Sequence, residues 1–503
     1  MAQLSNEKIM EDLPLRPVGN MERFNIVRNY LHFYNNVQVS ATYTIPSSLL
    51  SNFPSSTSSN QLQSLIYAGT QETLNQHPVM SVVIEDESTS KPKWKRLKTI
   101  NLNEVVKLIP GDPNASSDSW VQDAHRERLD RCDELPLWRV IVVTQDYPKE
   151  GTETEDGPVQ FSLGFFAHHA IVDGISAVAF HRTFLDVLNG YIANNTQRSL
   201  DEAETSLVPA PRLPLIPTLE EEGSFGVQIL FALKQAIKAL IYNRVDPLNW
   251  SGPMSDPSLP RPPVCNIRSF LLPTPLTNAV LAKCRNEKTT LTSLITVLTS
   301  RKLAVMYPDY KRFTGHIPFS VRKFTKRTQL DMGFFVTTIE PAFSSEIKTP
   351  SGYISCFTPS SPSESDGLLW ESCRIVGKYV TENTKSPNNQ LVGMAKFIPD
   401  MEKMFMGSLG KKRSRAFEVT NLGVVDGGLG EDGKGSDGKA SFDRLKFSAS
   451  LATSGNPYVV SIVSTKNGYM DITMAWETGV VSDDEAGKLL GWIDAELKRL
   501  GGE

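Results

Sequence analysis

The sequence predicts a mixed α/β fold divided into two large domains, on three observations. Its 503 residues exceed what one ordinary hydrophobic core holds. Strand-like and helix-like segments alternate in both halves, which is typical of mixed sheets flanked by helices. Prolines become frequent between residues 209 and 263, as in a connection between domains. We therefore expect an N-terminal domain at 1–208, a crossover at 209–265 and a C-terminal domain at 266–503.

Elements of the first half follow from local patterns. Runs of β-branched and aromatic residues predict strands at 79–85, 138–144 and 161–169. Apolar residues recur at helical spacing over 60–75 and 175–193, which predicts two helices. Together these segments predict a sheet with helices packed against it.

The crossover contains one strongly apolar segment, residues 225–242 (FGVQILFALKQAIKALIY), in which Lys234 and Lys238 lie one turn apart. Most of the helical circumference is apolar, so three interpretations stay open. The helix could pack against the rest of the protein, cover a substrate passage, or make peripheral contact with a membrane surface.

In the second half, two further stretches predict loops, a Ser/Pro-rich one at 353–367 and a Gly-rich one at 427–439. The regular elements expected there are helices at 276–307 and 492–500 and strands at 313–321 and 335–339.

The composition describes an ordinary globular protein. Hydrophobic residues make up 40%, charged residues 21%, and the formal net charge is -4, which argues against a nucleic-acid partner. The five cysteines are widely spaced and form no CxxC pair, so we expect neither a disulfide framework nor a thiolate zinc site. We find no signal-peptide pattern at the start and no apolar run of about eighteen residues. These features predict a cytoplasmic protein without a membrane span.

The most informative segment is residues 168–174 (HHAIVDG), which lies between a predicted strand and a predicted helix. A neutral imidazole, with an ordinary pKa of about 6.5, can take a proton from a hydroxyl near neutral pH. If 161–169 alternates as a strand, His168 and His169 point to opposite faces, so only one of them serves a given site. Asp173 begins the helix, where a carboxylate is stabilised, and Gly174 removes bulk at the turn.

Two other interpretations of this segment concern metal binding and structure. His168, His169 and Asp173 are metal-ligating residue types, but neighbouring histidines on opposite strand faces do not converge, so we expect no metal site. An isolated histidine pair is most often structural, and the surrounding pattern is what favours a functional role.

The pattern HHxxxDG resembles the active-site motif of the CoA-dependent acyltransferase superfamily. That group includes condensation domains, chloramphenicol acetyltransferase, plant BAHD acyltransferases and fungal alcohol acetyltransferases, and the chain is most similar to the last. The DFGWG segment of the plant enzymes is absent, and GYMDITMAWE at 468–477 stands nearest to it. Supporting segments are 16–22 (RPVGNME), 30–34 (YLHFY), 74–80 (LNQHPVM), 135–139 (LPLWR), 320–322 (SVR), 332–336 (MGFFV) and 417–423 (FEVTNLG).

The resemblance implies two chloramphenicol-acetyltransferase-like domains with a tunnel at their interface. Acetyl-CoA would enter as co-substrate from one side and a small-molecule alcohol from the other, with no permanently bound cofactor. His169 would be the general base for direct attack on the thioester, without an acyl-enzyme. Asp173 would be structural and pair with Arg322 of the second domain, and the protein would act as a monomer in ester biosynthesis of secondary metabolism.

The resemblance also implies donor-binding residues. Thr420 and Asn421 match the SNxG segment of relatives, which lies beside the tunnel. Lys412 and Arg415 precede that strand and could meet the phosphates of CoA, although a solvated loop is an equally good interpretation. Two alternative functions stay open: a condensation-type enzyme with a carrier-protein-bound donor, and an inactive binding protein that keeps the fold.

Overall fold

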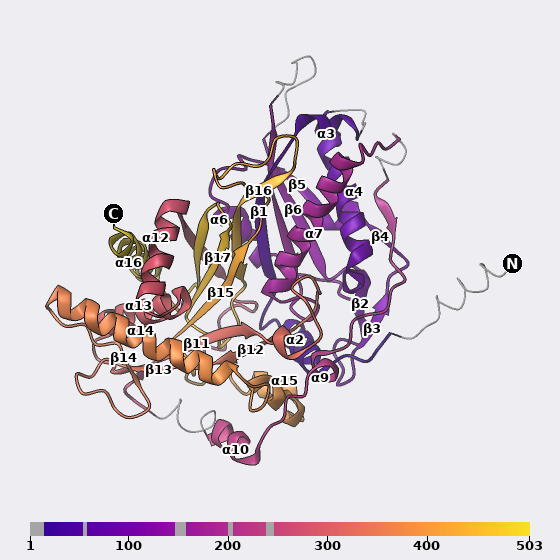
Figure 1. Ribbon diagram of the computed structural model, residues 1–503. Helices are drawn as coiled ribbons and strands as arrows, with labels where there is room; N and C mark the ends of the chain where they lie inside the picture. The colour runs from indigo at the N-terminus through magenta and orange to yellow at the C-terminus, as the bar shows by residue number, and fades with distance from the viewer. Residues whose placement is uncertain (1–14, 54–57, 146–156, 200–204, 238–245, 503) are drawn as a thin grey trace.

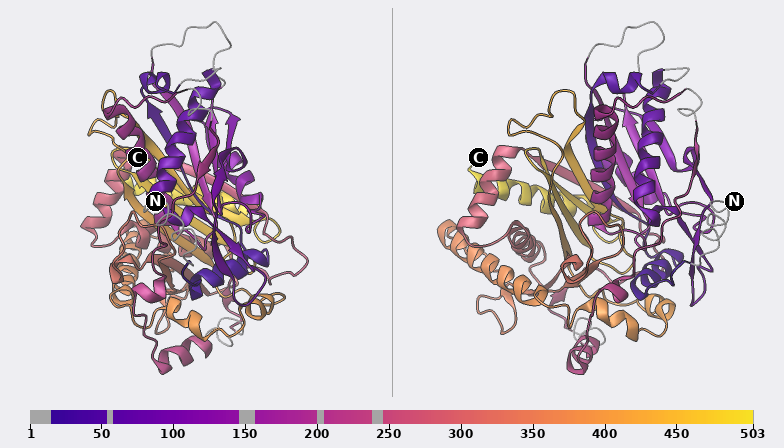
Figure 2. Two further views of the ribbon diagram at one scale, coloured as in Figure 1. Left: turned by 90° about the vertical axis from the view of Figure 1, so that its right-hand side faces the viewer. Right: turned by 45° about the vertical axis from the view of Figure 1, so that its right-hand side comes forward.

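A computed structural model describes residues 15–53, 58–145, 157–199, 205–237 and 246–502. Two lobes lie side by side, each built on its own sheet with helices on the outside (Figure 1). The turned views in Figure 2 show that the N-terminal helices and the C-terminal helices cover opposite sides of the molecule.

The first lobe contains a five-stranded sheet in the order β16-β1-β7-β6-β5. Four strands come from the first half: β1 (Val37–Ile45), β7 (Val159–Ala167), β6 (Trp138–Thr144) and β5 (Val106–Pro110). The fifth, β16 (Ser441–Ala449), comes from the second half and pairs antiparallel with β1, from Val37 opposite Ala449 to Thr44 opposite Ser441. The expected boundaries at 208 and 266 stay a prediction, but the first sheet is completed by a segment of the second half.

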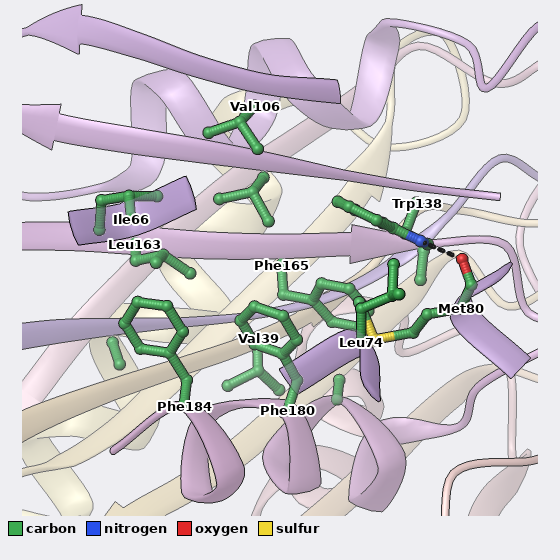
Figure 3. Close-up of a cluster of buried hydrophobic side chains, with 14 of the residues drawn as sticks. Val39, Ile66, Leu74, Met80, Val106, Trp138, Leu163, Phe165, Phe180 and Phe184 are labelled. Atoms are coloured by element: carbon green, nitrogen blue, oxygen red, sulfur yellow. Dashed lines mark hydrogen bonds between the residues drawn. The ribbon is translucent and has the colours of Figure 1, made fainter. Parts of the chain in front are cut away.

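Helices α4 (Ser58–Gln76) and α7 (Gly174–Ala193) cover one face of this sheet, and Figure 3 shows the core between them and the strands. The ring of Phe165 on β7 stacks on Phe180 of α7 with centroids 4.2 Å apart. The indole of Trp138 donates to the backbone carbonyl of Met80 at 2.7 Å, so its one polar atom is satisfied in the core. This packing fixes the end of β7 against the start of α7.

The second lobe contains a nine-stranded sheet within the described residues. Its helices are α12 (Thr274–Asn286), α13 (Leu291–Met306), α14 (Pro362–Thr384) and α16 (Asp483–Gly501). The strands in spatial order are β10 (Cys265–Leu272), β18 (Met470–Glu477), β17 (Tyr458–Thr465), β15 (Phe417–Val425), β11 (Arg312–Ser320), β13 (Ala342–Ser344) and β14 (Ile354–Ser355), with β12 (Val336–Ile339) and β9 (Asn249–Trp250) also paired to β11.

The other helices and strands of the described residues lie outside these two sheets and their main helices. They are α2 (Asn20–Tyr30), α3 (Ser47–Ser51), η1 (Pro78–Ser81), β2 (Val82–Glu85), β3 (Lys93–Arg96), β4 (Thr99–Asn101), α5 (Leu102–Val105), α6 (Asp118–Arg126), β8 (Leu207–Pro209), α9 (Leu219–Glu222), α10 (Ile229–Ile237), η3 (Arg322–Phe324), η4 (Leu391–Phe397) and α15 (Met401–Met406).

A small apolar cluster joins the two lobes. Ile141 and Phe166 of the first sheet pack with Ile267, Val459 and Ala475 of the second, and all five are buried. Phe166 lies on the strand face opposite Phe165, so β7 contributes to its own core on one side and to the interface on the other. The loop 168–173, which follows β7 and contains His168 and His169, therefore lies where the lobes meet.

Most of the predicted elements are confirmed, including the strand at 138–144 and the helix at 175–193, while three predictions are wrong in part. The helix expected at 276–307 is two helices, α12 and α13, because Lys288 between them adopts a positive φ of 56°. The loop expected at 353–367 contains the start of α14, where Pro362 occupies a first-turn position that suits proline. Residues 79–81 form part of η1 rather than strand.

The apolar helix expected at 225–242 is α10 over Ile229–Ile237, and its continuation lies outside the described residues. Among the described helices, none combines the length and the apolar character that crossing a membrane requires.

Candidate active site

A cavity of about 460 Å³ lies between the lobes, and His169 is one of its lining residues. The loop 168–173 connects the end of β7 to the start of α7. The other side chains that line the cavity come from both lobes, chiefly from α2, β11, β12, η4, β15 and β16. A volume of this size is typical of small-molecule sites.

One ring nitrogen of His169 is held by a hydrogen bond to the backbone. Its Nδ1 lies 2.7 Å from the carbonyl oxygen of Val172, and because a carbonyl only accepts, Nδ1 carries the hydrogen. The ring stacks on Tyr34 with centroids 5.5 Å apart and meets the edge of Phe334 at 5.2 Å. Nε2 is then the unprotonated nitrogen, and it has no hydrogen-bond partner among the described residues.

The surroundings keep this imidazole neutral. Burial and then the nearby positive charge of Arg28 lower the pKa of His169 to about 4, against weaker opposite effects of Asp173 and Glu418. The guanidinium of Arg28 lies over the Tyr34 ring, 3.9 Å from its centroid. At neutral pH the ring is therefore a base with a free lone pair.

The strand expected at 161–169 ends at Ala167, so neither histidine belongs to β7, and His168 is not among the residues that line the cavity. His168 is buried, its Nδ1 accepts from the backbone N–H of Ala170 at 3.0 Å, and its Nε2 is sealed without a partner. Burial lowers the pKa of His168 to about 3, so the ring stays neutral. In the part of the chain that the structure describes, no three histidine, cysteine or carboxylate side chains are grouped as metal ligands.

Asp173 and Arg322 form a buried clamp between the lobes. Arg322 donates from Nη1 to Oδ2 at 2.7 Å and from Nη2 to Oδ1 at 3.1 Å, and the two side chains are only 2% and 4% exposed. Asp173 also accepts from the backbone and hydroxyl of Ser176 at 2.8 and 2.9 Å and from the backbone N–H of Phe335 at 3.0 Å.

Burial alone would raise the pKa of Asp173, but the Arg322 charge and these hydrogen bonds outweigh it and hold the pKa below its ordinary value. The carboxylate is ionised, caps α7, and fixes the loop that carries His169.

Gly174 permits close approach of α7 to the second half of the chain. A Cβ at this position would lie 2.6 Å from the side chain of Leu422 on β15 and 3.2 Å from the ring of Phe447 on β16. A larger residue at this position would therefore displace the Leu422 side chain.

Thr420 and Asn421 line the cavity from β15 and already have partners. Thr420 Oγ1 donates to Glu418 Oε1 at 3.0 Å, and Asn421 Nδ2 donates to Thr292 Oγ1 at 3.1 Å. Asn421 Oδ1 accepts from the N–H of Gly423, which has a φ of +81°, where the pairing of β15 with β17 shifts register. The amide of Asn421 thus shapes the irregular end of this strand.

The basic cluster before β15 consists of Lys412, Arg413 and Arg415. Each of these side chains has a protein partner, whereas a solvated loop would leave them in water. Arg413 is buried and pairs with Glu477, and the ammonium of Lys412 donates to the carbonyl oxygen of Asp246 at 2.9 Å. Only Arg415 of these three lines the cavity, where it is held by Glu340.

The structure brings polar residues into the cavity that sequence patterns did not single out. His316 on β11 and Glu418 on β15 occupy paired positions of neighbouring parallel strands, so their side chains lie on one face of the sheet. Arg28 of α2 also lines the cavity. No spacing in the sequence signals this register.

His181 is a further histidine of the first lobe, two turns into α7 and outside the cavity lining. It is fully buried, with Nε2 2.9 Å from the carbonyl oxygen of Val39 and Nδ1 3.0 Å from the hydroxyl of Tyr43. The helix turns this residue toward the sheet, so its role is structural.

Comparisons with known proteins show what this chain is similar to. A family model described as alcohol acetyltransferase matches residues 17–495. A probable alcohol acetyltransferase of Aspergillus fumigatus is 25% identical over 481 residues, which cover 92% of this chain and 95% of that protein. A second, of Fusarium pseudograminearum, is 22% identical over 499 residues, covering 97% and 96%.

Solved structures show the fold. A trichothecene 15-O-acetyltransferase of Fusarium sporotrichioides matches with a TM-score of 0.66 at 12% identity, covering 97% of this chain and 94% of that one. The first condensation domain of the CDA synthetase matches with a TM-score of 0.55 at 10% identity, covering 98% and 97%. The expected fold, two chloramphenicol-acetyltransferase-like domains with mixed sheets, is confirmed.

Proposed function

We propose, because this chain belongs to the alcohol acetyltransferase family, that it esterifies an alcohol by direct transfer of an acetyl group from acetyl-CoA, with His169 as the general base. The observation that carries this proposal is the fixed tautomer of His169 at the cavity. Nδ1 is occupied by the Val172 carbonyl, so the basic Nε2 is the nitrogen available to a bound hydroxyl.

In the proposed step, Nε2 takes the proton of the acceptor hydroxyl while its oxygen attacks the thioester carbonyl. The tetrahedral intermediate then expels the thiolate of CoA, which receives the proton from the imidazolium. The Val172 carbonyl accepts from Nδ1–H throughout and so stabilises the charged ring. The clamp of Asp173 and Arg322 keeps the loop in place, which supports catalysis through alignment.

Donor contacts are part of the proposal. Arg415 lines the cavity and is the basic residue we assign to the phosphate-bearing end of acetyl-CoA, whereas Lys412 lies outside the lining residues. Thr420 can donate to the thioester oxygen only if its hydroxyl leaves Glu418, whereas the amide of Asn421 has a second hydrogen besides the one it gives to Thr292. Loss of one such donor would slow the reaction by about 10²- to 10³-fold.

The acceptor we propose is a hydroxylated secondary metabolite, since one protein with this fold is a trichothecene 15-O-acetyltransferase. The test supplies purified protein with acetyl-CoA and a panel of alcohols, without any carrier protein, and measures thiol release and ester mass. Ester formation supports the proposal. Transfer only from a carrier-bound donor would favour the condensation-type alternative, and no transfer from either donor would favour a binding protein.

The lowered pKa of His169 predicts an unusually acidic limit of activity. The neutral ring is the active form, so kcat/KM should stay level from neutral pH downward and fall only near the pKa of about 4. Arg28→Met removes the charge that contributes most after burial, so its acid limb should move to higher pH. Profiles of kcat/KM against pH for both proteins measure this, and coincident limbs would contradict it.

The melting temperature must accompany these profiles, because folding stability itself changes with pH. Burial lowers the pKa of His125 and of His168 to about 3, far below the value of an unfolded histidine. The unfolded chain therefore binds more protons as pH falls below about 6.5, and folding stability decreases in that direction. Rates are compared only at pH values where both proteins stay folded.

Helix α10 supports peripheral contact with an anionic membrane surface. Ile229 and Leu230 are 85% and 81% exposed, and none of the residues of α10 is buried. Residues 223–245 contain Lys234, Lys238 and Arg244 but no acidic residue, so the segment's charge complements anionic lipid. We propose a cytoplasmic monomer that makes contact with an intracellular membrane through α10.

We expect the protein to co-sediment with vesicles of phosphatidylserine and phosphatidylcholine at low salt. The double variant Ile229→Ser, Leu230→Ser should lose most of this binding, because it removes the most exposed apolar area of α10. Leu207→Ser with Val305→Ser is the matched control, since those residues are also exposed, at 57% and 62%, but lie elsewhere. Equal binding of both variants and the wild type would refute the contact.

A further inference from the structure

The cavity contains a second oriented imidazole besides His169. His316 Nδ1 lies 2.8 Å from Glu418 Oε2, and their side chains are 11% and 18% exposed. Because an ionised carboxylate only accepts, Nδ1 carries the hydrogen and Nε2 of a neutral ring presents a lone pair. No described residue is a hydrogen-bond partner of that Nε2, and His316 is one of the residues that line the cavity.

Glu418 is held in place from several sides. Its Oε2 also accepts from Asn456 Nδ2 at 2.9 Å, and its Oε1 accepts from the hydroxyl of Thr420 at 3.0 Å. Burial would raise the pKa of Glu418, but His316 and Thr420 outweigh it and keep the carboxylate ionised. A carboxylate fixed by three donors orients the His316 ring as the Val172 carbonyl orients His169.

Apolar side chains supply much of the cavity lining around the polar groups. Apolar surface comes from Met21 and Phe24 of α2, from Phe334, and from Leu391 and Met394 of η4. An apolar cavity with a few fixed polar groups selects ligands whose polar atoms match those positions. A free imidazole lone pair beside a carboxylate matches a hydroxyl donor and disfavours an anionic group.

We propose that His316, positioned by Glu418, binds a second hydroxyl group of the acceptor, so that the enzyme prefers alcohols with a further hydroxyl beyond the one that is acetylated. This inference rests on the proposed function. When an acceptor without a second hydroxyl fills the cavity, Nε2 of His316 has no hydrogen-bond partner. This lowers the affinity for such an acceptor.

The test measures binding of linear α,ω-diols and of primary alcohols of equal chain length by calorimetry, without acetyl-CoA. After correction for the two equivalent hydroxyls, the wild type should bind a diol of matching length about three- to tenfold more tightly than the corresponding alcohol. His316→Phe should reduce this ratio to about one, since it keeps an aromatic ring but removes the acceptor nitrogen. Glu418→Gln, which can still accept from Nδ1–H, should retain more of the preference than Glu418→Ala.

Thr338→Val is the matched control, because it removes another hydroxyl from the cavity lining and should keep the diol preference. Absence of a preference in the wild type, or its persistence in His316→Phe, would overturn the inference. So would a His316→Phe variant whose affinity changes for acetyl-CoA alone, which would assign the imidazole to a pantetheine amide. A wild type that prefers diols but releases no thiol would contradict only the proposed function.

Discussion

Replacement of His169 by alanine is expected to lower kcat/KM by about 10²- to 10⁴-fold, the range that a positioned general base contributes. Nε2 is the nitrogen left basic by the bond from Nδ1 to Val172, and no second ring at this loop can replace it, because His168 is buried and does not line the cavity. The fold should survive, since the ring lines a cavity and one backbone hydrogen bond is lost. Thiol release and melting temperature measure the two effects.

A matched control separates loss of the base from loss of any histidine. His32→Asn suits this purpose, because His32 has a positive φ of 61°, which asparagine tolerates, and it does not line the cavity. Its rate should equal that of the wild type. Substantial ester formation by a folded His169→Ala protein would remove His169 from the mechanism.

Arg322→Ala is expected to destabilise the protein by about 3 to 5 kcal/mol, because it leaves the Asp173 carboxylate buried without its cation. Activity should fall as well, since the loop that carries His169 loses its attachment to the second lobe. Asp173→Asn should act in the same direction. Denaturant unfolding gives the free energy, and thiol release at a temperature where the variant is folded gives the rate.

The chain offers a close control for this prediction. Arg499 and Asp366 form the same bidentate pair, at 2.9 and 3.0 Å, but their side chains are 47% and 40% exposed. Arg499→Ala should therefore cost less than about 1 kcal/mol. If the two variants lose equal stability, burial is not the cause and the clamp is not what fixes the loop.

The parts of the site that are contiguous in sequence could be predicted. The segment 168–174 connects the end of β7 to the start of α7 and Asp173 caps that helix, as the local pattern predicts, while the role of His169 as a base stays a prediction. The pairing of Asp173 with Arg322 is present in the structure, as the resemblance implied.

Residues brought together by strand register could not be predicted. His316 and Glu418 are neighbours only because β11 and β15 pair in parallel at these positions, which no local pattern encodes. The same limit applies to Arg28, which reaches the cavity from α2 and lowers the pKa of His169. The error at 353–367 has another cause: serine and proline suit loops and also the first turn of a helix.

The position of β16 determines when the first sheet can be completed during synthesis, and it limits which fragments of the chain can fold alone. β1 is made early, but its outer neighbour comes from residues 441–449, so a ribosome completes most of the chain before that edge is paired. Until then the nine residues of β1 present open backbone groups, the kind of edge that recruits other chains into aggregates. An isolated N-terminal fragment would keep this edge open indefinitely. Any attempt to study the first lobe alone should therefore graft β16 onto it or supply the strand as a peptide.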